Sequence, residues 1–144
     1  MFKLDLDSRL SAWATLRHKL EQDAEPLMSV WQFWQQAPFI PYNKNIDPFN
    51  RHSWPTPWEI IAENKYDDFT LALMIGHTIK YTTRFADSII EVKTLVDKEK
   101  NIAYNIVFVD DEWALNYAEN GPIPSKKVPD SFSLENLVVI GTPR

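Results

Sequence analysis

The chain has 144 residues, 44% of them apolar and 24% charged, and it contains no cysteine. This length is enough for one domain with a hydrophobic core that needs no disulfide, and the lack of cysteine excludes thiol catalysis and thiolate-bound zinc. The net charge of −5 argues against phosphate-neutralising nucleic-acid binding, and an acidic start without a long apolar run predicts neither a signal peptide nor a membrane partner.

The first part of the single domain expected over residues 1–144, residues 1–36, carries the pattern of amphipathic helices. Apolar residues from Leu10 to Leu20 recur at intervals of three and four, which predicts a helix over about residues 8–23. Pro26 suits the first turn of a second helix.

The pattern changes over residues 37–57, where five prolines alternate with aromatic residues. Proline cannot donate to a strand ladder, and a long loop of this kind is typically functional or disordered. Disordered segments are poor in aromatics, so we expect an ordered strap that either covers the core or binds a partner. The candidate partner-binding residues are all aromatic: Phe39, Tyr42, Phe49, Trp54 and Trp58.

Two helices are predicted over residues 58–84. Thr56 and Glu59 have the spacing of a capping box, with Pro57 at the first helical position. Asp67 or Asp68 can then cap a central core helix.

The central helix, predicted over residues 68–84, carries an apolar stripe that begins at Phe69. Gly76 interrupts this stripe at a cost of about 1 kcal/mol relative to alanine, which indicates that something packs against the backbone there.

Residues 88–140 are predicted to form antiparallel strands at 89–96, 102–109, 113–117 and 137–140. Helices followed by strands indicate an α+β fold. We expect the N-terminal helices and the central helix to pack on one face of an antiparallel β-meander.

The order of central helix and three strands resembles the transglutaminase-like group, relatives of the papain fold. Residues 66–73 read Tyr-Asp-Asp-Phe-Thr-Leu-Ala-Leu, similar to the family pattern Cys-x-Asp-Phe-Ala-x-Leu. Residues 102–113 resemble the family segment His-Ala-Trp-Asn-Glu-Val-Tyr-Leu-Asp-Gly-Lys-Trp without gaps. The resemblance covers about 50 residues and implies the same scaffold.

The catalytic positions of that family are not preserved. The resemblance puts the nucleophile at Tyr66 or Asp67, the histidine at Ile102, and the acid at Tyr117 or Asn116. A thiolate needs an imidazole and an orienting group, and none of the three is present. The resemblance therefore implies a non-catalytic member, with no catalytic residue, cofactor or metal.

The segment from Trp54 to the start of the central helix also resembles small proteins of tailed bacteriophages. This resemblance implies a virion, assembly or host-takeover role, with phage structural proteins or a host protein as partners. It places the protein in the virion or in the host cytoplasm, which the absence of cysteine also fits.

An enzymatic alternative remains, a hydrolase or another enzyme that uses Asp67 and Asp68 with His52 or His77. Against it, the two carboxylates suit a helix cap. The three histidines, of which His18 is the third, lack the spacing of a helical zinc pair.

Two further groups of residues fit a structural role better than a binding site. Residues 110–112, all acidic, fit a solvated turn better than a calcium loop. Four tryptophans could stack on single-stranded nucleic acid or sugar, but core and strap packing explains them better in an acidic protein: Trp31, Trp34, Trp54 and Trp58.

The sequence thus favours a non-enzymatic protein that binds another protein or takes part in an assembly, such as a virion component. The alternative within the same class is a phage-encoded inhibitor of a host protein. Rigid aromatics on a proline-fixed backbone lose little entropy on docking, which favours the strap as the contact surface.

Overall fold

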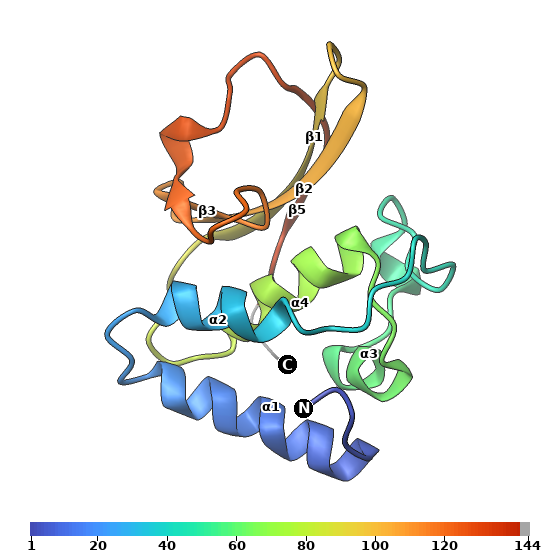
Figure 1. The fold of residues 1–144 in the computed structure, drawn as a ribbon, viewed down its shortest axis with the longest axis vertical. Helices are drawn as coiled ribbons and strands as arrows, with labels where there is room; N and C mark the ends of the chain where they lie inside the picture. The colour runs from blue at the N-terminus through green and yellow to red at the C-terminus, as the bar shows by residue number, and fades with distance from the viewer. Residues whose placement is uncertain (142–144) are drawn as a thin grey trace.

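The computed structural model describes residues 1–141 and has the predicted α+β architecture, with four α-helices on one side of a five-stranded antiparallel sheet (Figure 1). The helices are α1 (Leu6–Leu20), α2 (Pro26–Trp34), α3 (Pro57–Glu63) and α4 (Asp68–Lys80). The strands are β1 (Ile90–Asp97), β2 (Ile102–Val109), β3 (Trp113–Leu115), β4 (Ile123–Pro124) and β5 (Ser133–Val139). Helix α4 packs directly on β1 and β2.

The predicted helix caps are confirmed. The Thr56 hydroxyl accepts from the Glu59 N–H, and the Glu59 carboxylate accepts from the Thr56 N–H, which starts α3. Asn64 ends α3 in the left-handed conformation, with φ of 59°. Asp67, one of the two predicted alternatives, caps α4.

The central helix is shorter than the predicted range of 68–84. It ends at Lys80, because the carboxylate of Glu21 accepts from the N–H groups of Thr83 and Arg84. This contact with the end of α1 holds the chain in a turn, and it joins residues more than 60 positions apart that no local pattern relates.

The sheet has the order β4-β3-β2-β1-β5, so the predicted meander is confirmed and the last strand returns to the other side of β1. Strand β3 stops at Leu115 and does not reach residue 117, because Asn116 has a φ of 66°. Strand β5 starts at Ser133, earlier than the predicted residue 137. Of its first four residues only Leu134 is apolar, so this part of the strand gives little apolar signal.

The two faces of the sheet have separate cores. Val92 of β1 and Val107 of β2 pack with the helices, whereas Ile106 and Phe108 lie on the opposite face. The connection around residues 117–132 covers that second face with Val128 and partly buried aromatics. The polar, proline-rich connection in the sequence is therefore a second covering layer.

Gly76 lies where the helix approaches the sheet most closely. A Cβ atom at this position would be 3.0 Å from Cγ1 of Ile140 and 3.5 Å from Cγ2 of Ile90. The prediction that something packs against the backbone at Gly76 is confirmed.

A buried hydroxyl joins three helices at the centre of the helical layer. The indole N–H groups of Trp13 in α1 and Trp34 in α2 both donate to Oγ1 of Thr78 in α4, each at 3.0 Å. The Thr78 hydroxyl in turn donates to the carbonyl of Met74 at 2.6 Å. All three side chains are fully buried, so this hydrogen-bonded centre fixes how α1, α2 and α4 pack together.

Candidate functional site

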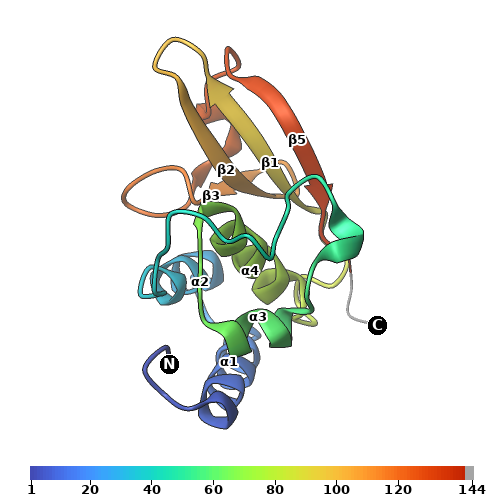
Figure 2. The same cartoon turned by 90° about the vertical axis from the view of Figure 1, so that its right-hand side faces the viewer.

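The strap runs across the surface between α2 and α3, with one short 3-10 turn, Arg51–Ser53 (Figure 2). Its first part pairs with Tyr66, which lies two residues before α4. Ile40 N–H donates to the Tyr66 carbonyl at 3.0 Å, and Tyr66 N–H donates to the Pro38 carbonyl at 3.2 Å. This short parallel bridge fixes the backbone on both sides of Phe39.

Asp67 holds the middle of the strap and caps α4 with the same carboxylate. Its Oδ2 accepts from the Asn43 N–H at 2.9 Å. Its Oδ1 accepts from the Thr70 N–H at 2.8 Å and from the Thr70 hydroxyl at 2.6 Å. The strap and the central helix therefore share one buried side-chain carboxyl group, which we expect to fix their relative position.

The second half of the strap is anchored by side chains. Ile46 is buried in the main core, and the Trp54 ring lies 5.6 Å from that of Phe69. Trp54 also donates to the Asp47 carbonyl, and Asn136 in β5 donates to the Pro48 carbonyl. The strap is thus tied to α4 and to the sheet along its length.

The predicted partner-binding residues divide into two groups. Phe39, Tyr42 and Phe49 are 65%, 70% and 74% exposed. Trp54 is half-buried and serves as an anchor, while Trp58 lies edge-on against Trp13 and remains 41% exposed. Three large aromatic side chains therefore point away from a backbone that is fixed on its inner side.

The transglutaminase-like resemblance placed a triad at Tyr66, Ile102 and Tyr117, and these three side chains do not meet. Tyr66 is buried against the rings of Phe2 and Trp34, and burial raises the pKa of its phenol, which stays protonated. Ile102 lies at the β1–β2 turn, and Tyr117 packs with other aromatics in the core on the far face of the sheet.

Asp68 instead meets two amides at the point where α4, β2 and β3 converge. Nδ2 of Asn105 donates to Asp68 Oδ2 at 2.9 Å, and Nδ2 of Asn116 donates to Asp68 Oδ1 at 3.3 Å. The Thr94 hydroxyl donates to Oδ1 of Asn105 at 2.7 Å. Amides do not accept a proton as imidazole does, so this cluster links the helix to the sheet but has no general base beyond the carboxylate.

Sequence reasoning missed Asn105, although it named Asn116 and Asp68. Asn105 is cross-strand partner of Thr94, and residue alternation puts both on the sheet face that carries α4. The only available signal was a polar residue on the otherwise apolar inner face of β2.

In the enzymatic alternative, His77 is separated from the two aspartates. Asp67 and Asp68 lie at the start of α4 and His77 near its end, roughly 14 Å along the helix axis. His52 lies exposed in the 3-10 turn, and His18 is exposed on α1. Within residues 1–141 no three carboxylates or imidazoles are grouped so as to hold a metal, and the turn at residues 110–112 is solvent-exposed.

The four tryptophans do not share an exposed surface. Trp34 is fully buried and donates to Thr78, and Trp31 is partly buried beside it in α2. A stacking platform made of Trp31, Trp34, Trp54 and Trp58 is therefore not formed.

His77 gives a testable pH dependence. Burial, together with the positive charge of Arg51, lowers its pKa from 6.5 to about 4. Between these two values the unfolded chain takes up a proton that the folded protein does not. The free energy of unfolding should therefore fall as the pH decreases from 7, and we expect a loss of roughly 1–2 kcal/mol at pH 5 from this residue.

Urea unfolding of the wild type and of His77→Leu at pH 7 and pH 5 measures this loss. The variant should lose less stability than the wild type over the same interval. Equal losses in the two proteins would show that His77 is not responsible.

Comparison of the chain with family models, with curated proteins and with solved structures finds no match. The transglutaminase-like and bacteriophage resemblances thus stay predictions. In the part of the chain that the structure describes, no helix is both long and apolar enough to cross a membrane.

Proposed function

We propose that this protein is a non-enzymatic binding protein whose partner is another protein, and that the strap is the contact surface. The observation that carries the proposal is the exposure of Phe39, Tyr42 and Phe49 on an anchored backbone. Large aromatic residues contribute a large share of binding energy at protein interfaces.

Preorganisation supports this role. The backbone of the strap is held by Tyr66, by Asp67 and by Asn136, so little conformational entropy remains to be lost when a partner binds. A flexible loop with the same aromatics would bind more weakly.

The surface next to Tyr42 offers a further contact. A shallow groove of about 200 Å³ lies there, lined by strap residues that include Lys44, by Glu63 at the end of α3, and by Lys65 two residues later. A groove of this size accepts one side chain of a partner, and its charges, two lysines and one glutamate, favour a polar group at the rim. The bacteriophage resemblance would make the partner a virion protein or a host protein.

Site-specific photo-crosslinking tests the proposal. A photoreactive phenylalanine analogue at position 42 or 49, introduced in the cells that naturally produce the protein, should attach covalently to one recurring partner. The matched controls are positions 89 and 134, where Ile89 and Leu134 are 60% and 55% exposed outside the strap. Cross-linking of the same partner with equal yield from all four positions would contradict the proposal.

A further inference from the structure

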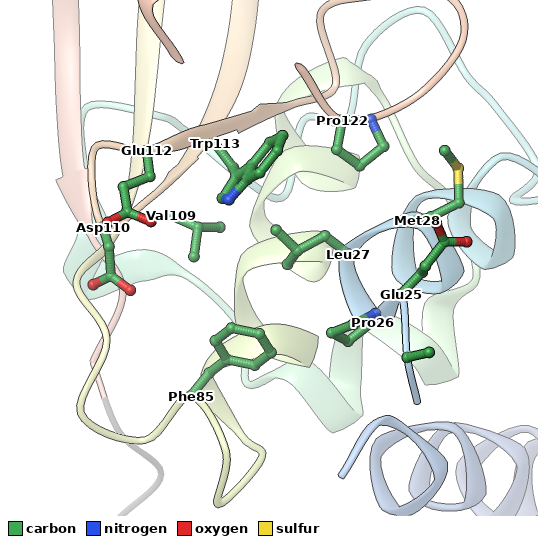
Figure 3. Close-up of a pocket in the computed structure, with 11 residues that line it drawn as sticks. Glu25, Pro26, Leu27, Met28, Phe85, Val109, Asp110, Glu112, Trp113 and Pro122 are labelled. Atoms are coloured by element: carbon green, nitrogen blue, oxygen red, sulfur yellow. The ribbon is translucent and has the colours of Figure 1, made fainter. Parts of the chain in front are cut away.

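A cleft lies on another part of the molecule, between the start of α2 and the turn that joins β2 to β3 (Figure 3). Its volume is about 480 Å³, within the range of small-molecule sites. Leu27 forms part of its wall, and Phe85 and Trp113 lie on opposite sides of the opening (Figure 3). These residues make an apolar space with two aromatic rings.

The charged residues that line this cleft are all acidic. Asp110 and Glu112 lie at one end and Glu25 at the other (Figure 3). No lysine or arginine lines the cleft. The two cations of the neighbouring segment are engaged by backbone carbonyls: Lys80 donates to Ala86 and Ser88, and Arg84 donates to Leu20 and Asp23.

The acidic end of the cleft is preformed. Asp110 accepts from the Ile89 N–H at 2.8 Å, and the Ser125 N–H donates to the Glu112 carbonyl at 2.8 Å. The carboxylates of Glu25 and Glu112 make no hydrogen bond within residues 1–141, so both are free to meet a ligand.

From this geometry we infer that the cleft binds a small organic cation with an apolar body, such as an arylalkylamine. The ammonium group would lie at the end formed by Asp110 and Glu112, between these carboxylates and the face of Trp113, where the charge and the ring quadrupole both attract a cation. The apolar body would lie against Leu27 and Phe85. A neutral or anionic ligand of the same shape would gain only the apolar part of this interaction.

Three probes of nearly equal shape test the inference on the full-length protein: 4-phenylbutylammonium, 4-phenylbutanol and 4-phenylbutyrate. Calorimetric titration should give a Kd for the amine about tenfold lower than for the alcohol, and weaker binding still for the carboxylate. The indole N–H resonance of Trp113, assigned with Trp113→Phe, should shift on addition of the amine.

The variant Glu25→Gln with Glu112→Gln should reduce the preference for the amine to about twofold or less. The matched control is Glu99→Gln with Glu135→Gln, which removes the same charge at exposed positions outside the cleft and should keep the preference. Thermal unfolding of each variant verifies that it is folded.

Equal affinity for the amine and the alcohol would overturn the inference, and so would an unchanged preference in the cleft variant. Binding of a basic peptide without binding of the amine would also overturn it, because the cleft would then belong to a protein partner. None of these results depends on the strap, so they do not bear on the proposed function.

Discussion

Replacing Thr78 with valine is expected to lower the free energy of unfolding by roughly 2–5 kcal/mol. Valine has nearly the shape of threonine, so no cavity forms, but the acceptor of two indole N–H groups is lost. Trp13 and Trp34 are fully buried, and within residues 1–141 each indole N–H donates only to Thr78. A buried donor left without a partner costs about 1–3 kcal/mol, and here two are left.

Equilibrium unfolding in urea measures the loss. Thr15→Val is the matched control, since Thr15 is exposed on α1, and it should change stability by less than about 0.5 kcal/mol. A Thr78→Val protein as stable as the wild type would show that the hydroxyl does not join the three helices.

Asp67→Ala is expected to have the second-largest effect, a loss of roughly 2–4 kcal/mol, because three hydrogen bonds to one carboxylate disappear. The substitution should also loosen the strap locally, an effect that the free energy of unfolding does not report. Without Asp67 the N–H of Asn43 has no partner, so amide exchange along the strap should become faster than exchange in the sheet.

Hydrogen exchange followed by mass spectrometry resolves this effect. Asp68→Ala is the matched control, because Asp68 contacts Asn105 and Asn116 and not the strap. It should leave the exchange of the strap unchanged. If both variants speeded exchange in the strap equally, Asp67 would not be its specific anchor.

The parts of the fold that could be predicted from the sequence rest on short-range chemistry. The capping box of Thr56 and Glu59, the cap at Asp67 and the strand at residues 102–109 each depend on residues within a few positions. Even the close packing at Gly76 was predictable, since a glycine in a helical stripe is costly unless a neighbour needs the space.

The features that sequence reasoning missed depend on contacts between distant residues. Asn105 and Asp68 are 37 positions apart, and only the register of β1 against β2 decides that Asn105 faces the start of α4. The cleft combines the start of α2 with a turn more than 80 positions later. No periodicity or motif relates such segments.

The strap has features of both kinds, some predictable from neighbouring residues and others set by distant contacts. Its order and its aromatic character were predicted from the alternation of proline with large rings. Which rings point outward was not predicted, because Trp54 and Phe49 have similar local contexts. Trp54 turns inward because it meets Phe69 and the Asp47 carbonyl, and Phe49 stays 74% exposed.

The most direct test of the account is the affinity of the cross-linked partner for Phe39→Ala, Tyr42→Ala and Phe49→Ala combined in one chain. Calorimetry should show a Kd at least roughly 100-fold higher than that of the wild type, with stability unchanged, because three interface aromatics are removed from an intact backbone. The control, Ile89→Ala with Leu134→Ala, should bind like the wild type. If the triple variant were to bind its partner with wild-type affinity, the strap would not be the binding surface.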